Sequence, residues 1–191
     1  MMGALLSTAL AATGPGVDLG YEASSNDPFA TFHGLRLGLS TELLPGWTLT
    51  GAAVTTLQPG PSLTRSITPP GGGWSLYPDK VLIRGRLSAT SEFYPLSSQD
   101  GRLHARIGVR LGAGLVRTEH YWHPSDAYSS DIQRHLAPIF GVVGQLSHGA
   151  FVATATCEQM PYDEVLGAEV VLRKDVLFTG FSVGLRLGDA Q

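Results

Sequence analysis

Hydrophobic and polar residues alternate with a period of two along most of this chain. The clearest run covers 177–187, where Leu177, Thr179, Phe181, Val183, Leu185 and Leu187 alternate with Phe178, Gly180, Ser182, Gly184 and Arg186. Runs of the same kind cover 35–43, 81–90 and 103–115, and weaker ones cover 16–24, 47–57, 135–147 and 150–160. Successive side chains of a β-strand point to opposite faces, so each run predicts a strand with two different surroundings. Because no segment has a convincing helical period, the sequence predicts an all-β chain of eight strands.

The connections between these runs alternate between short and long. Short turns are expected at 44–46, 97–102 and 148–149, and longer connections at 24–33, 58–79, 119–134 and 161–174. Antiparallel barrels in a membrane have this asymmetry, with short turns on the periplasmic side and long loops outside. An even number of strands also places both termini of the barrel's chain at the short-turn side.

Alternation alone does not distinguish a soluble lipocalin-like calyx, which is apolar inside, from a membrane barrel, which is apolar outside. Charged residues make up only 15% of the chain, whereas a soluble domain usually has roughly 25%. The polar faces of the runs consist mainly of Gly, Ser, Thr and Arg, which suits a narrow interior that side chains must fill. We therefore predict a polar network in the lumen that consists of Arg36, Glu42, Arg84, Arg86, Glu92, Arg106, Arg110, Glu158 and Arg186. Asp18 and Glu22 are further carboxylates that we expect to point inward.

The energetic cost of the opposite orientation supports this choice. The opposite orientation would turn the six arginines among these residues toward lipid. Each would cost roughly 2–4 kcal/mol near the membrane midplane. That total rivals the net stability of a whole domain, about 5–15 kcal/mol. The fold class we predict is therefore an eight-stranded antiparallel up-and-down transmembrane β-barrel, with the soluble calyx as the alternative.

The first residues of the chain predict export. Residues 1–13 are apolar and small and read as a secretory signal peptide, which leaves 14–191 for the barrel domain. Cys157 is the only cysteine, so the chain cannot form an intramolecular disulfide. We expect the protein in the bacterial outer membrane.

Three features of the chain fit one known family: the eight alternating runs, His-Leu-Ala-Pro at 135–138 followed by Gly141 and Gly144, and the closing segment 178–185. In these features the chain resembles small bacterial outer-membrane β-barrel proteins of the OmpA or OmpW type. This resemblance implies the lipid bilayer and outer-membrane lipids as surroundings, and the barrel assembly machinery as a partner during insertion. The family's last strand usually ends on an aromatic residue, whereas this one ends on Leu187.

Two clusters suggest chemistry. His120, His123 and Asp126 are a weak candidate for a metal site, but a strand would send the two histidines to opposite faces. The simpler interpretation makes Tyr121 and Trp122 interfacial aromatics at the lipid headgroups. Ser147 and His148, with Glu158, are candidates for a lipid-modifying enzyme, but the adjacent Ser147 and His148 would also point to opposite faces of a strand.

The function that fits best is a structural anchor or interaction protein that acts through its long outer loops, with the lumen closed by arginine and carboxylate side chains. Its partner would be another envelope protein or a second copy. A narrow pore or a binding barrel for a small amphipathic ligand is the alternative, and a lipid-modifying enzyme is a weaker one. We expect no cofactor, and the formal net charge of −3 gives no indication of nucleic-acid binding.

Overall fold

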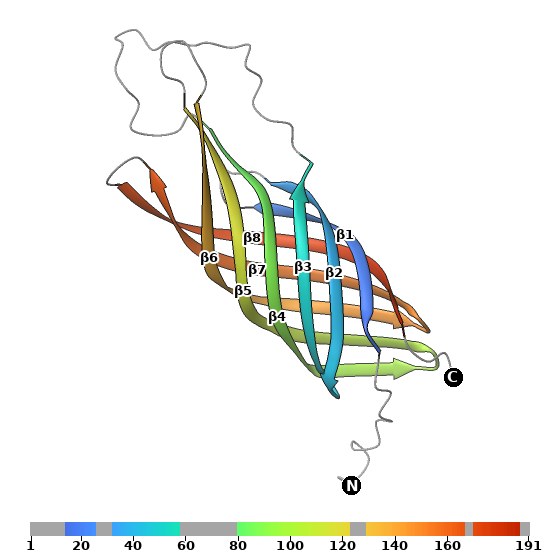
Figure 1. The fold of residues 1–191 in the computed structure, drawn as a ribbon. Helices are drawn as coiled ribbons and strands as arrows, with labels where there is room; N and C mark the ends of the chain where they lie inside the picture. Colours follow the sequence, from blue (N-terminus) through green and yellow to red (C-terminus); the bar gives the residue numbers. More distant parts are fainter. Residues whose placement is uncertain (1–13, 26–31, 58–79, 123–128, 167–169, 188–191) are drawn as a thin grey trace, which may run out of the picture.

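The chain forms a single closed antiparallel barrel (Figure 1). The computed structural model describes residues 14–25, 32–57, 80–122, 129–166 and 170–187, so the expected signal peptide at 1–13 lies outside the described residues. The strands are β1 (Gly16–Ser25), β2 (His33–Leu44), β3 (Trp47–Thr56), β4 (Lys80–Asp100), β5 (Leu103–Trp122), β6 (Ser129–His148), β7 (Phe151–Leu166) and β8 (Val170–Arg186). Each strand pairs with the next, and β1 pairs with β8, which confirms the prediction of eight strands. Among the described residues there is no helix that is long and apolar enough to cross a membrane.

The strands are staggered as well as closed. Directly opposed residues form one row around the barrel, from Leu136 on β6 through Leu115, Leu87, Ala53, Leu37, Leu19, Val183 and Ala153 to Leu146. The row thus returns to β6 ten residues from its start. A stagger of this kind requires the strands to tilt against the barrel axis, and an eight-stranded barrel leaves an interior just wide enough for side chains.

The short turns lie at the end where β1 begins and β8 ends (Figure 1). Gly46, Gly101 and Gly149 occupy them with φ angles of 75°, 58° and 59°. This left-handed region strains residues that carry a Cβ, so glycine suits these turns. The expected turn at 97–102 is shorter than predicted, because β4 continues to Asp100.

Two of the predicted long connections are also shorter than expected. β5 continues to Trp122 and β6 already begins at Ser129, while β7 reaches Leu166 and β8 begins at Val170. These extensions pair in register, as Trp122 with Ser129 and Leu166 with Val170 show. Hydrophobic alternation fades there because both faces carry polar residues, although the backbone ladder continues.

The wall is apolar outside, and the buried charged residues lie inside. Leu111 and Val183 are 55% and 56% exposed, whereas Arg110 between the outward residues of β5 is 1% exposed. β3 shows the same alternation of exposed and buried residues along its length. A water-soluble calyx would have the opposite arrangement, so the structure favours the membrane barrel over that alternative.

β4 contains a bulge that the sequence pattern did not reveal. The ladder to β5 shifts between Ile83 and Gly85, so the residues before this bulge are out of step with those after it. Val81 and Ile83 therefore point inward, although the run 81–90 had grouped them with the outward Leu87. The same shift moves Arg84 out of the lumen series, which corrects its expected place in the network.

The ladder between β6 and β7 is incomplete. These strands pair from Phe140 opposite Gln159 to His148 opposite Phe151, and beyond Phe140 the described part of β6 pairs with β5 alone. Continuing the register would bring Pro138 opposite Pro161, and proline has no N–H to donate. Side chains bridge this seam instead. The Gln133 amide bonds both the N–H and the carbonyl of Val165, at 3.3 and 2.7 Å, and the His135 ring stacks on Tyr162 with centroids 4.8 Å apart.

Candidate functional site in the barrel interior

Glu158 is the centre of a buried ion-pair network in the lumen. Its Oε2 accepts a hydrogen bond from Nη1 of Arg86 at 2.5 Å, and its Oε1 accepts one from Nη1 of Arg110. Arg86 also donates through Nη2 to Glu22 at 2.5 Å, and Nη2 of Arg110 lies 2.9 Å from Glu92. All five side chains are at most 4% exposed. Removing any one charge would upset the charge balance of this buried group, which is costly where water cannot compensate.

Arg36 extends this network toward β1. Its Nε lies 3.5 Å from Asp18, and its Nη1 lies 3.8 Å from Glu22. Neither of these nitrogens has a hydrogen-bond partner within the described part of the chain. Arg36 is thus held by charge attraction across longer distances than Arg86 or Arg110. The continuous network contains three arginines and four carboxylates drawn from β1, β2, β4, β5 and β7.

A second polar group lies nearer the short turns. Arg106 donates from Nη1 to Glu42 at 3.4 Å and from Nη2 to the side-chain oxygen of Gln145 at 2.5 Å. Arg186 donates to the same Gln145 oxygen at 2.6 Å, so the structure shows an amide where a carboxylate was expected. The Arg106 guanidinium also lies over the Tyr94 ring, 4.5 Å from its centroid, and the Tyr94 hydroxyl donates to Glu92 at 2.6 Å. Tyr94 thereby connects the two polar groups.

Gln145 and Tyr94 were not among the predicted network residues. A search for opposite charges overlooks both, because neither is ionised at neutral pH. Alternation is the signal that could have found them: Gln145 follows the inward Val143 by two positions, and Tyr94 follows the inward Glu92.

The lumen is apolar on the outer side of the network. A cluster of buried side chains fills it, comprising Phe32, Val54, Val81, Ile83, Val116, Ala137, Ile139, Met160, Tyr162, Val176 and Phe178. Phe178 lies against the network, with its ring centroid 4.6 Å from the Arg86 guanidinium carbon. The interior is therefore closed by an apolar layer as well as by ion pairs, which the sequence pattern did not predict.

Beyond the apolar layer lies a small polar cluster around His120. The His120 Nε2 is 2.9 Å from Glu164, whose other carboxylate oxygen lies 3.8 Å from the Lys174 ammonium. The Thr118 hydroxyl lies 2.9 Å from Nε2 of His135. His120, Glu164 and Lys174 come from segments that the sequence analysis assigned to long connections, which is why the cluster was not predicted.

The metal candidate is not assembled in the described part of the chain. His120 bonds Glu164, whereas His123 and Asp126 lie outside the described residues. The described residues contain no group of three or more His, Cys, Asp or Glu side chains that could hold a metal ion.

Tyr121 and Trp122 are the two predicted interfacial aromatics. Tyr121 lies under Arg84, with 5.8 Å from the guanidinium carbon to the ring centroid, and its hydroxyl accepts a hydrogen bond from Arg84. Arg84 also pairs with Glu119 at 2.5 Å instead of joining the lumen network. The Trp122 side chain lies outside the described residues.

The Ser147, His148 and Glu158 set is not brought together. Ser147 is buried and lies 3.4 Å from the carbonyl oxygen of His104, while His148 is exposed. Glu158 is bound to two arginines. These three residues therefore do not form the arrangement that nucleophilic catalysis requires.

The closed ring, the apolar exterior and the buried arginine–carboxylate network define a small transmembrane β-barrel of the bacterial outer-membrane class. Solved structures with this fold include Ail, the attachment invasion locus protein of Yersinia pestis, with a TM-score of 0.53 and 19% identity over 92% of this chain and 99% of that one. The N-terminal β-barrel domain of Pseudomonas aeruginosa OprF matches with a TM-score of 0.50 and 15% identity over 92% and 99%. A structure of Ail with the heparin analogue sucrose octasulfate matches with a TM-score of 0.50 and 17% identity over the same shares. No family model matches the chain, and no curated protein matches it either. At these identities the likeness is one of fold.

Proposed function

We propose that this protein is an integral outer-membrane barrel that serves as a structural anchor or interaction protein, with its contacts made outside the membrane. The observation that carries the proposal is the closed lumen. The ion pairs around Glu158 and the apolar cluster around Phe178 occupy successive levels of the same interior. A pore would need a continuous polar path, and the apolar layer interrupts one.

The strands themselves extend well past the apolar part of the wall. The outward residues of β5 are apolar or small up to Leu115, and Arg117 and Glu119 follow. Twenty residues at a rise of ~3.4 Å and a tilt of ~40° climb about 50 Å, twice the ~25 Å apolar band of such barrels. The β5–β6 hairpin therefore offers a folded surface beyond the bilayer, on which Ile132 is 43% exposed.

Bilayer conductance tests the closed lumen. The refolded protein, added to a planar lipid bilayer, should give no discrete conductance steps. Regular steps with a defined ion selectivity would contradict the closed lumen and favour the pore alternative.

Photo-crosslinking in whole cells tests the interaction role. A photoreactive residue at Ile132, on the projecting hairpin, should give discrete protein adducts. The matched control is Val142, which is 55% exposed within the apolar band and should give lipid adducts. Lipid adducts alone at both positions would contradict an interaction through this hairpin. The Ail complex with sucrose octasulfate suggests that polyanion as a first soluble ligand to assay.

A further inference from the structure

Two arginines face each other on the outer surface of the wall. Arg117 on β5 is the direct partner of Arg134 on β6, and both side chains are exposed. Their neighbours Val116 and His135 are buried in the lumen, so the arginines belong to the outward series. Within the described residues neither guanidinium has an ion pair or a hydrogen bond. Like charges directly opposite each other on a sheet destabilise it unless something neutralises them.

The pair lies one step beyond the apolar wall. Two residues nearer the short turns on each strand, Leu115 faces Leu136, and Leu136 is 77% exposed. Two residues correspond to about 7 Å along a strand. The guanidinium groups therefore lie at the depth where the headgroups of outer-leaflet lipids meet the acyl chains that cover these leucines.

Glu119 does not neutralise the pair. It is the neighbouring outward residue on β5, but it is bound at 2.5 Å to Nε of Arg84. The outward face of β4, β5 and β6 thus holds three arginines against one carboxylate in this zone, with two positive charges left uncompensated by described residues.

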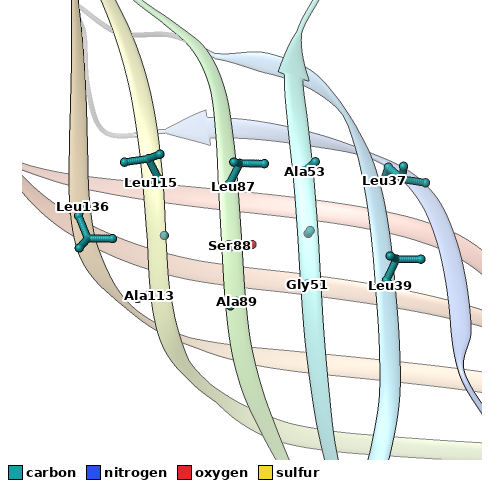
Figure 2. A pocket seen from close by; sticks show the side chains of 12 residues that line it. Leu37, Leu39, Gly51, Ala53, Leu87, Ser88, Ala89, Ala113, Leu115 and Leu136 are labelled. Atoms are coloured by element: carbon teal, nitrogen blue, oxygen red, sulfur yellow. The ribbon is translucent and has the colours of Figure 1, made fainter.

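The wall directly below the pair is hollowed. A shallow groove of about 490 Å³ crosses β2 to β6, and Leu115 and Leu136 belong to its lining. Its floor contains the small residues Gly51, Ala53, Ala89 and Ala113, while leucines stand around them (Figure 2). Small residues beside large ones leave room for an apolar chain along the wall.

We propose that the arginine pair and the groove form one binding site for a phosphorylated, acylated lipid of the outer leaflet. A lipid phosphate lies between the guanidinium groups of Arg117 and Arg134, and one acyl chain lies in the groove below. The planar guanidinium matches phosphate oxygens with paired hydrogen bonds. A phosphate also relieves the repulsion between the two arginines, so both halves of the site favour the same ligand.

Binding measurements on the refolded barrel in a nonionic detergent test the phosphate half. The titrants are bisphosphorylated lipid A, the same lipid with its phosphates removed, and inorganic phosphate. A basic residue near a membrane surface contributes about 1 kcal/mol, or roughly fivefold in affinity. The double variant Arg117→Gln/Arg134→Gln should therefore bind lipid A roughly 20-fold more weakly and the dephosphorylated lipid unchanged. The control Arg102→Gln removes an exposed arginine from the β4–β5 turn at the opposite end and should have no effect.

A second variant tests the groove. Ala89→Phe fills its floor and should weaken lipid A binding severalfold, whereas Ala155→Phe on the outward face of β7 should not. Different gel migration of unheated and boiled samples verifies that each variant is folded. Equal affinity of the native protein and the double arginine variant for lipid A would overturn the proposal. Inorganic phosphate bound as tightly as lipid A would overturn the lipid as the ligand.

Discussion

Glu158 is the residue on which the interior depends most, because it bonds two arginines at once. We expect Glu158→Gln to lower the free energy of unfolding by about 3–5 kcal/mol, since it leaves Arg86 and Arg110 without a shared counter-charge in a buried site. Equilibrium unfolding in urea with the protein in lipid vesicles measures the change.

The matched control is Glu119→Gln, which removes a carboxylate from a partly exposed pair with Arg84. It should cost no more than about 1 kcal/mol. Equal losses in the two variants would show that the lumen network is hydrated or that its charges are paired differently.

Arg106 and Arg110 were expected to pair with inward carboxylates, and the structure gives them different surroundings. Arg110 meets Glu92 and Glu158 directly, whereas Arg106 has one carboxylate at 3.4 Å and relies on Gln145 and the Tyr94 ring. Arg110→Leu should therefore destabilise the barrel more than Arg106→Leu in the same unfolding assay, because it leaves more buried charge unpaired. The reverse order would contradict the assignment of partners.

At the scale of the strand, the seam between β6 and β7 is where the backbone ladder described by the structure is incomplete. The amide side chain of Gln133 takes the place of a backbone partner for Val165. Gln133→Ala should therefore speed the amide hydrogen exchange of Val165, measured by NMR, while Gln159 within the regular ladder keeps its protection.

The control for the seam is Gln99→Ala, which removes a side-chain amide that bonds Gly101 at the β4–β5 turn. It should leave the exchange of Val165 unchanged. Unaltered exchange at Val165 in Gln133→Ala would show that other contacts hold the seam closed.

For the whole molecule, the decisive feature is the reversed polarity of the wall. Leu111 is exposed in the apolar band, one position from the buried Arg110. Leu111→Arg should cost about 2–4 kcal/mol if that residue faces lipid near the midplane, measured by unfolding from vesicles. Arginine at Leu43, outward on β2 close to the short turn, should cost only about 0–1 kcal/mol because it lies near the interface. Equal costs at both positions would contradict the placement of the membrane.

The strand count, the orientation of the wall and much of the interior could be predicted from the sequence. Period-two alternation identifies strands, and the scarcity of charge with arginines on the polar side excludes an exterior in water. The same logic places Arg86, Arg110, Glu92 and Glu158 in the lumen, because each is in step with its strand's polar series.

Only the tertiary structure decided where that series fails and which residues meet. Arg84 is the extra residue of the bulge between Ile83 and Gly85, and this bulge puts the residues before it out of step with those after it. The pairing of Glu158 with Arg86 joins residues far apart in sequence across the lumen, and closure with a ten-residue stagger sets which strands face each other there. Alternation specifies on which side of the wall each side chain lies. Its position along the barrel axis and the residue that it contacts across the lumen follow from how the sheet closes.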